Sequence, residues 1–314
     1  MLTVDPAELR ATQDHFGFLR PEPIEKDWHV TQAVAALAAI DAAPFRLVFS
    51  GGTCLARAHR IMRRMSEDID FKVVTIDPQQ LVSRGARRQQ LAALRQQVSE
   101  ALRAAGFASA AASVQSRNEN HYIVYQLSYP SSGGAEQVLR PTIQIELTYA
   151  PLMQSAIALP VQSLLAEAFG RKAEVPAIDC VSVTQTAAEK LVAVTRRTAM
   201  ELAGVSRDPD PTLVRHLYDL HMMTDHIDRA AAIALAHQVA QQDAEEFKNQ
   251  YPAYHADISG ETRKALVAMR SIPTTRARYT NFVAAMVYGE QSSFDTAMAS
   301  LAALVDEAWP ENVG

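Results

Sequence analysis

Residues 49–71 have the sequence FSGGTCLARAHRIMRRMSEDIDF, and this stretch decides the expected fold. The apolar run at 45–49 predicts a short buried strand. Gly51 and Gly52 follow it directly and predict a tight turn, because glycine enters unusual backbone conformations at little cost. Residues 53–65 are predicted to form a helix with a basic face. Residues 69–74 alternate in polarity and contain β-branched residues, which predicts a second strand.

Two aspartates, Asp68 and Asp70, stand at the start of this second strand. Residues i and i+2 of a strand point to the same face, so the two carboxylates are expected to project together. Carboxylates held this close repel each other unless a cation lies between them. Mg²⁺ prefers such hard oxygen ligands, and two-metal phosphoryl-transfer sites use them. Glu146, on a predicted strand at 141–149, is the candidate third carboxylate.

The DxD pattern by itself also fits two solvated acids at a strand edge. The glycine pair one helix earlier favours the metal site, because backbone N–H groups of such a turn can contact phosphate. The Lys-Ser/Thr pair of a P-loop does not follow these glycines, which argues against an ATPase of that class.

The chain has 314 residues, enough for two domains. We expect an α+β fold with a mixed α/β part at 1–160 and a mainly helical part at 161–314. The first part includes a long helix at 81–105 and strands at 122–129 and 141–149, joined by a turn at 131–134. The second includes an extended piece at 178–183, a helix start capped by Thr186 and a long helix at 282–305.

Composition narrows the class of protein. Hydrophobic residues make up 48% and charged residues 21% of the chain, as in globular proteins, and the net charge is −5. The negative balance argues against broad non-specific nucleic-acid binding, although one basic patch would still be compatible with it. Cys54 and Cys180 have no metal-ligand spacing. The N-terminus lacks the apolar core of a signal peptide and no stretch is long enough to span a membrane, so we expect a cytoplasmic protein without a membrane partner.

The order of several motifs resembles the AbiEii-like nucleotidyltransferase toxins, which belong to the polymerase-β-like superfamily and include the MenT toxins. The motifs are GGTCL at 51–55 and SEDIDF at 66–71, preceded by EKDW at 25–28. EKL at 189–191, with Arg196 and Arg197 behind it, and RHLYDL at 215–220 complete the set. His216 stands where aspartate is common in the family. The resemblance covers about 24–220.

The resemblance implies a nucleotidyltransferase core, a mixed sheet flanked by helices, followed by a helical domain that completes the nucleotide cleft. It implies an NTP substrate, one or two Mg²⁺ ions, and a toxin of a toxin–antitoxin or phage-defence pair with a possible cognate antitoxin. The MenT-like members add nucleotides to the 3′ end of tRNA and so block translation. RNA is therefore the expected acceptor.

Site roles follow from the resemblance and the residue types. The catalytic candidates are Asp68, Asp70, Glu146, Lys190 and Asp219, and the first three are the metal ligands. The nucleotide-binding candidates are Gly51, Gly52, Thr53, Ser66, Lys190 and Arg196. Glu146 could instead be an ordinary surface acid, and Lys190 with Asp219 could be an ion pair that joins two helices.

Arginines near the acids form a candidate RNA surface. Arg57, Arg60, Arg63 and Arg64 share the predicted helix face, and with Arg84, Arg87 and Arg88 they could follow an RNA backbone. A solvated helix face explains them equally well.

Three functions are compatible with the sequence. The first is Mg²⁺-dependent transfer of a nucleotide to an RNA 3′ end. The second is nucleotidyl transfer to a hydroxyl of a protein or small molecule, which the acidic balance slightly favours and the arginine-bearing helix disfavours. The third is a non-catalytic nucleotide-binding scaffold, which the presence of all three acids and the glycine turn disfavours.

Overall fold

The computed structural model describes residues 3–77, 83–107, 114–130, 139–140, 142–205 and 210–311. They form two compact units, Met1–Ser182 and Val183–Gly314. The turn expected at 131–134 and the first residues of the helix expected at 81–105 lie outside the described residues.

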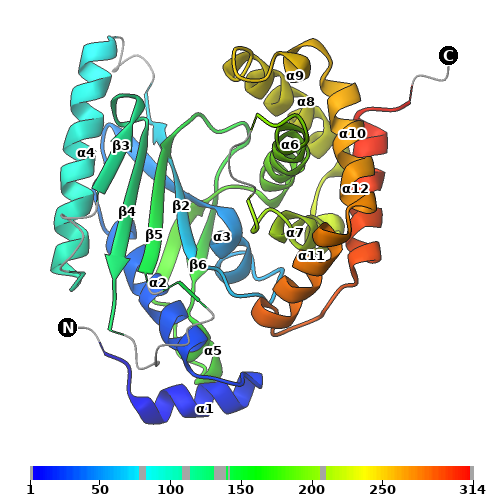
Figure 1. The fold of residues 1–314 in the computed structure, drawn as a ribbon. Helices are drawn as coiled ribbons and strands as arrows, with labels where there is room; N and C mark the ends of the chain where they lie inside the picture. The colour runs from blue at the N-terminus through cyan, green and yellow to red at the C-terminus, as the bar shows by residue number, and fades with distance from the viewer. Residues whose placement is uncertain are drawn as a thin grey trace. The chain divides into compact units, whose positions relative to one another are not determined.

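A seven-stranded sheet forms the centre of the first unit, in the order β3-β4-β5-β2-β1-β7-β6 (Figure 1). The strands are β1 (Phe45–Ser50), β2 (Asp68–Thr75), β3 (Val114–Arg117), β4 (Tyr122–Ser128), β5 (Thr142–Tyr149), β6 (Ile157–Val161) and β7 (Val175–Cys180). β2 runs parallel to β5 and antiparallel to β1, and β7 runs parallel to β1. The sheet is therefore mixed, and the expected α+β fold is confirmed.

The first unit extends beyond residue 160, the boundary expected from the sequence, because β6 and β7 belong to its sheet. β6 and β3 are the two edge strands, and the sequence pattern predicted neither. β6 contains the exposed Pro160 at an irregularity in its pairing with β7, as edge strands and bulges tolerate, and β3 is short and mostly exposed.

Helices cover one face of this sheet. The helices of the first unit are α1 (Pro6–Phe16), α2 (Glu22–Ala38), α3 (Gly51–Arg57), α4 (Arg84–Ala104) and α5 (Leu164–Ala168). Val34 of α2 and Leu94 of α4 share one buried core with Phe71 of β2 and Ile145 of β5. Figure 1 shows α4 alongside β3 and β4. The polar side chains of β2 and β5 point to the opposite face.

The helix expected over 53–65 is wrong beyond Arg57, where α3 ends. The backbone of Arg60 has φ 56°, which no α-helix contains. The His59 ring bonds the Val181 carbonyl oxygen at 2.8 Å, and the Arg57 guanidinium is held by a buried acid. These tertiary contacts override the helix propensity of the segment.

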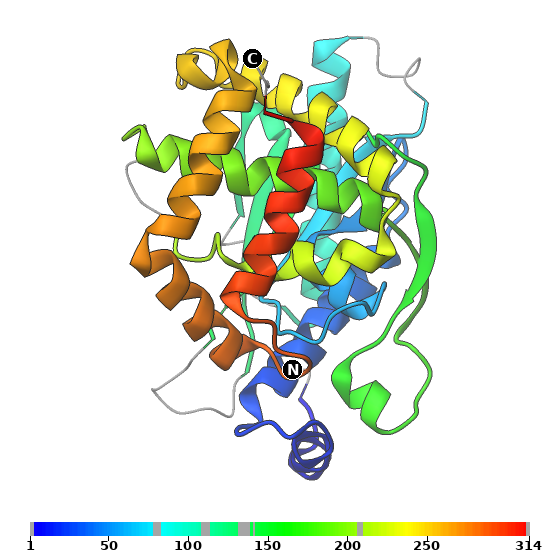
Figure 2. The same cartoon turned by 90° about the vertical axis from the view of Figure 1, so that its right-hand side faces the viewer.

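The second unit consists of helices. They are α6 (Val183–Leu202), α7 (Arg215–Met223), α8 (Arg229–Glu246), α9 (Pro252–Ala256), α10 (Ile258–Ser271), α11 (Pro273–Met286) and α12 (Phe294–Ala308). α6 packs against α7, α8 and α10, and Figure 2 shows α12 (red) beside α10 (orange).

Two expectations for this unit are wrong. Thr186 does not cap a helix start, since it is buried inside α6. The helix expected over 282–305 is two helices, because α11 ends at Met286 and Ser293 caps α12 by accepting a hydrogen bond from the Thr296 N–H. Among the described residues, no helix is both long and apolar enough to cross a membrane.

Candidate active site

Three carboxylates lie on the polar face of two neighbouring strands. Asp68 and Asp70 alternate with the buried Ile69 and Phe71 on β2, as the strand period requires. In the parallel pairing of β2 with β5, Asp70 lies opposite Glu146. The structure thus places Asp70 beside Glu146, although the two residues are 76 positions apart in the sequence.

The glycine pair meets these acids directly. Gly51 has φ 75°, and a β-carbon at this position would lie 1.9 Å from the Oδ2 atom of Asp70. Ser50 Oγ donates to the backbone carbonyl of Asp70 at 3.1 Å, and the Thr53 hydroxyl donates to the carbonyl of Asp68. The junction of β1 with α3 therefore fixes the backbone that carries both aspartates. It also uses the hydroxyl of Thr53, which was expected to contact nucleotide.

Gly52 lies against Arg64 and Ser66. A β-carbon on Gly52 would be 2.2 Å from Nη2 of Arg64 and 3.2 Å from Oγ of Ser66. Arg64 is only 3% exposed and donates from Nη1 to the Met65 carbonyl at 2.9 Å. Its positive charge lies beneath the glycine turn and does not face solvent.

The four arginines expected on one basic helix face do not share such a face. Arg57 is buried and pairs with Asp27 at 2.5 Å, and Arg64 is buried as well. Arg60 and Arg63 are exposed but follow the end of α3. The expected helical RNA-binding surface is therefore wrong in its geometry, while contacts of Arg60 and Arg63 with RNA stay a prediction.

A buried charge cluster fixes the start of β2. Lys26 Nζ donates to Glu67 Oε1 at 2.9 Å and to the Arg140 carbonyl at 2.7 Å, and the Arg140 N–H donates to Glu67 Oε1 at 2.6 Å. Burial lowers the pKa of Lys26, and Glu67 only partly opposes this. Burial would raise the pKa of Glu67, but the charges and hydrogen bonds of Lys26 and Arg140 together outweigh it and lower that pKa.

Arg140 also reaches the first aspartate. Its Nη2 atom lies 2.5 Å from Oδ1 of Asp68, and the two side chains are 44% and 29% exposed. Sequence reasoning did not select Arg140, because it follows a stretch without periodicity and belongs to none of the motifs.

Glu146 has two polar neighbours that the sequence did not single out. Gln144 Nε2 donates to Glu146 Oε1 at 2.5 Å. The Tyr122 hydroxyl hydrogen-bonds the Glu146 carboxylate, and burial together with the charges of Glu146 and Asp70 raises the pKa of Tyr122. Tyr122 thus faces both acids and stays protonated at neutral pH.

In the second unit, Lys190 of α6 and Asp219 of α7 form a buried ion pair. Lys190 Nζ lies 2.9 Å from Asp219 Oδ2, and their side chains are 10% and 0% exposed. The Nδ1 atom of His216 lies 3.2 Å from the same ammonium group. His216, the departure from the family pattern, therefore contacts the expected catalytic lysine.

Arg196 is engaged within this unit. Its Nε donates to Asp243 Oδ2 at 2.7 Å, and its guanidinium lies 4.2 Å from the centre of the Phe247 ring. These contacts are sufficient to explain Arg196 by packing of α6 on α8, so its expected contact with nucleotide stays a prediction.

The carboxylates of the first unit suit a hard divalent cation by their chemistry. They are not preassembled around one point, since no group of three or more His, Cys, Asp or Glu side chains in the described ranges is close enough to hold a metal ion. Asp68 is turned to Arg140, and Glu146 to Gln144 and Tyr122. Asp68, Asp70 and Glu146 are the residues that would hold Mg²⁺ at this face of the sheet.

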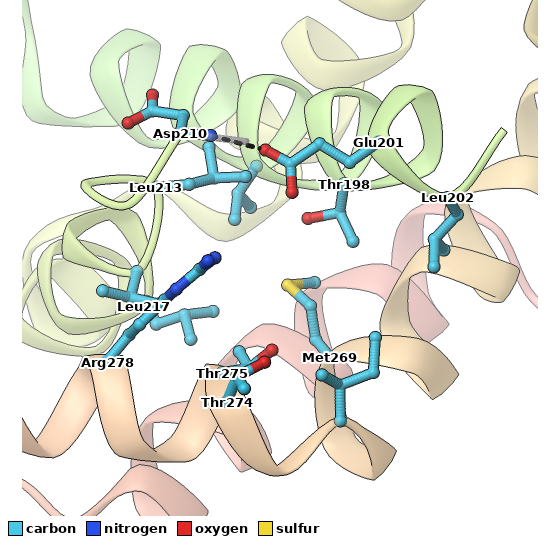
Figure 3. A pocket seen from close by; sticks show the side chains of 13 residues that line it. Thr198, Glu201, Leu202, Asp210, Leu213, Leu217, Met269, Thr274, Thr275 and Arg278 are labelled. Atoms are coloured by element: carbon cyan, nitrogen blue, oxygen red, sulfur yellow. Dashed lines mark hydrogen bonds between the residues drawn. The ribbon is translucent and has the colours of Figure 1, made fainter. Parts of the chain in front are cut away.

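The second unit also contains a cavity of about 270 Å³ among α6, α7, α10 and α11 (Figure 3). Leu213, Leu217 and Met269 supply apolar lining, and Arg278 and Glu201 supply charge. Neither Lys190 nor Asp219 lines it. The cavity is therefore separate from the expected catalytic residues of this unit.

Comparison with known proteins identifies the class. The family model described as "Nucleotidyl transferase AbiEii toxin, Type IV TA system" matches residues 35–300, most of the chain. The protein belongs to this family of nucleotidyltransferase toxins from toxin–antitoxin systems.

One similar solved structure is MenT4, a nucleotidyltransferase toxin from Mycobacterium tuberculosis H37Rv. It is 17% identical, with a TM-score of 0.47, and the match covers 97% of this chain and 99% of that one. No curated protein matches the chain.

Proposed function

We propose that this nucleotidyltransferase uses Mg²⁺ to transfer a nucleoside monophosphate from an NTP to the 3′ end of an RNA, in particular the tRNA acceptor stem. Pyrophosphate leaves and the blocked RNA can no longer support translation. The observation that carries the proposal is the opposition of Asp70 and Glu146 on β2 and β5, with Asp68 on the same face.

The residues of the site have separate tasks. Asp70 and Glu146 would hold the cation with Asp68, and Glu146 would also accept the proton of the attacking hydroxyl. Bound Mg²⁺ would neutralise the charge of the triphosphate and stabilise the pyrophosphate leaving group. Gly51 keeps room for the Asp70 carboxylate. Gly52 and Ser66 lie beside the buried cation of Arg64, which favours phosphate at this turn.

Lys190 and Asp219 have a task that is harder to separate from stability. Lysine suits a triphosphate as a compact charge. Asp219 is fully buried and orients Lys190 within the second unit. We propose that Lys190 contacts the triphosphate and that Asp219 positions it.

The acceptor is tested by offering one α-labelled NTP at a time to deacylated tRNA and sequencing the RNA 3′ ends. New 3′ nucleotides on tRNA, dependent on Mg²⁺, support the proposal. Intact 3′ ends on every RNA offered, with NTP still consumed and label found elsewhere, contradict the RNA acceptor.

One observation favours a second acceptor class, a hydroxyl of a protein or small molecule. Arg57 and Arg64 are buried, so the basic surface near the acids is smaller than the sequence suggested. Label recovered on a protein or a small hydroxylated acceptor, with tRNA unlabelled, would support this class.

A further inference from the structure

Arg140 forms an ion pair with Asp68, one of the carboxylates that the proposed metal site needs. Its Nη2 atom bonds Oδ1 of Asp68 at 2.5 Å, while Asp70, the neighbouring ligand on the same face of β2, lies against Gly51. The positive charge of Arg140 can offset the repulsion between the two aspartates in the absence of a metal ion. A role of Arg140 at this carboxylate rests on the proposed function of the same site.

Hydrogen bonds anchor the backbone of Arg140, whereas its side chain is held by ion pairs with Asp68 at 2.5 Å and, through Nε, with Glu67 Oε2 at 3.8 Å. Its N–H and carbonyl groups bond Glu67 and the buried Lys26, so the residue is anchored next to the start of β2. The side chain is 44% exposed and its ion pair is at the surface, where such pairs contribute little to stability. A guanidinium held in this way can leave Asp68 without moving the chain that carries it.

We propose that Arg140 is the resident counter-ion of Asp68 and that it exchanges partners when the metal-bound nucleotide arrives. Asp68 would then help to hold the cation, and the released guanidinium would pair with the triphosphate. Arginine suits both partners, because its planar fork matches carboxylate and phosphate oxygens alike.

Substitution of Arg140 should change two binding affinities in opposite directions, and both can be measured by calorimetry on the full chain. Arg140→Gln removes the competitor for Asp68, so Mn²⁺ alone should bind up to roughly fivefold more tightly, which corresponds to the strength of an exposed ion pair. The Mn²⁺ complex of a non-transferable α,β-methylene NTP should bind more weakly than to the unchanged protein. Arg140→Lys keeps a positive charge at this position, so both affinities should lie between those of the unchanged protein and of Arg140→Gln.

Arg46→Gln is the matched control. Arg46 pairs with Asp179 at 3.1 Å on the same sheet, with side chains 43% and 37% exposed, close to the values of Arg140 and Asp68. This variant should change neither affinity. Thermal unfolding of each variant separates loss of binding from loss of fold.

Three results would overturn the exchange. Unchanged Mn²⁺ affinity in Arg140→Gln means that Arg140 does not compete for Asp68. Tighter binding of both Mn²⁺ and the nucleotide complex means that Arg140 only blocks the site. A lower unfolding temperature without an affinity change assigns it a purely structural role. If the unchanged protein binds Mn²⁺ no better than Asp68→Asn does, the metal site of the proposed function fails instead.

Discussion

A β-carbon at Gly51 would lie 1.9 Å from the Oδ2 atom of Asp70, so the side chain of the second aspartate occupies the space that any other residue at position 51 would need. Contacts below 3.0 Å to a β-carbon essentially do not occur in real structures. The glycine turn and the carboxylate therefore form one structural unit, although 18 residues lie between Gly51 and Asp70 in the sequence.

Gly51→Ala is expected to reduce nucleotidyl transfer by displacing the Asp70 carboxylate. The left-handed backbone costs alanine about 1–2 kcal/mol of stability, and the contact with Asp70 adds to it. Transfer rate and unfolding temperature should both fall. Gly170→Ala is the control for backbone strain, since Gly170 has φ 59° and nothing within 4 Å of a β-carbon. Equal activity of the two variants would show that Gly51 does not position Asp70.

Lys26→Met is expected to lower the free energy of unfolding by about 3 kcal/mol, because it leaves the buried Glu67 carboxylate without its ammonium partner. Lys26→Met combined with Glu67→Leu should recover a large part of this loss, since it removes both charges together. Urea unfolding measures the series. A single variant as stable as the unchanged protein would show that the cluster does not stabilise the start of β2.

His29 makes the stability of the first unit depend on pH. Its ring is 1% exposed and lies among Trp28, Phe107 and Tyr129, and burial lowers its pKa to about 4, partly opposed by the Pro130 carbonyl. The unfolded chain therefore binds a proton more readily than the folded one between pH 6.5 and 4. The neutral His29 ring leaves the free energy of unfolding at its full value above pH 6.5. As the pH drops to 4, protonation of this residue in the unfolded chain lowers that free energy by about 3 kcal/mol.

His29→Phe should flatten this acid-side loss in urea unfolding between pH 7 and 4.5. His15→Phe is the control, because His15 is exposed. Identical pH profiles for His29→Phe and the unchanged protein would refute the assignment.

The Lys190–Asp219 pair is expected to serve stability and activity together. Asp219→Leu alone leaves the ammonium buried without its acid and should cost about 3–5 kcal/mol of stability. Adding Lys190→Met should restore much of the stability, while NTP binding by calorimetry stays weak. Full NTP binding by the stable double variant would reduce the pair to a connection between α6 and α7.

The sequence predicted the parts of the site whose geometry is local. Strand alternation placed Asp68 and Asp70 on one face, and the same period on β5 allowed Glu146 to be chosen. It did not predict that Arg57 and Arg64 are buried, because the partner of Arg57, Asp27, comes from a distant helix and Arg64 packs beneath Gly52.

The sequence did not predict the roles of Arg140 and Tyr122 in the site, for the same physical reason as for the buried arginines. Arg140 is positioned by Lys26 and Glu67, and Tyr122 by the pairing of β4 with β5, so each depends on tertiary contacts that leave no periodic signal. The break after α11 was missed although residues 288–293, YGEQSS, form a polar stretch with a glycine that is typical of a loop. Local sequence patterns predicted the strands and the acids, whereas the positions of Arg140, Tyr122 and the buried arginines depend on long-range contacts.

The central claim is that Asp70 and Glu146 hold the metal that enables nucleotidyl transfer. The most direct measurement follows transfer of α-labelled NTP to tRNA and release of pyrophosphate by the unchanged protein, Asp70→Asn and the exposed control Asp41→Asn, each shown to be folded by thermal unfolding. Both readouts should fall by at least about a hundredfold in Asp70→Asn and stay unchanged in Asp41→Asn. A folded Asp70→Asn protein that labels RNA at the unchanged rate would contradict the claim.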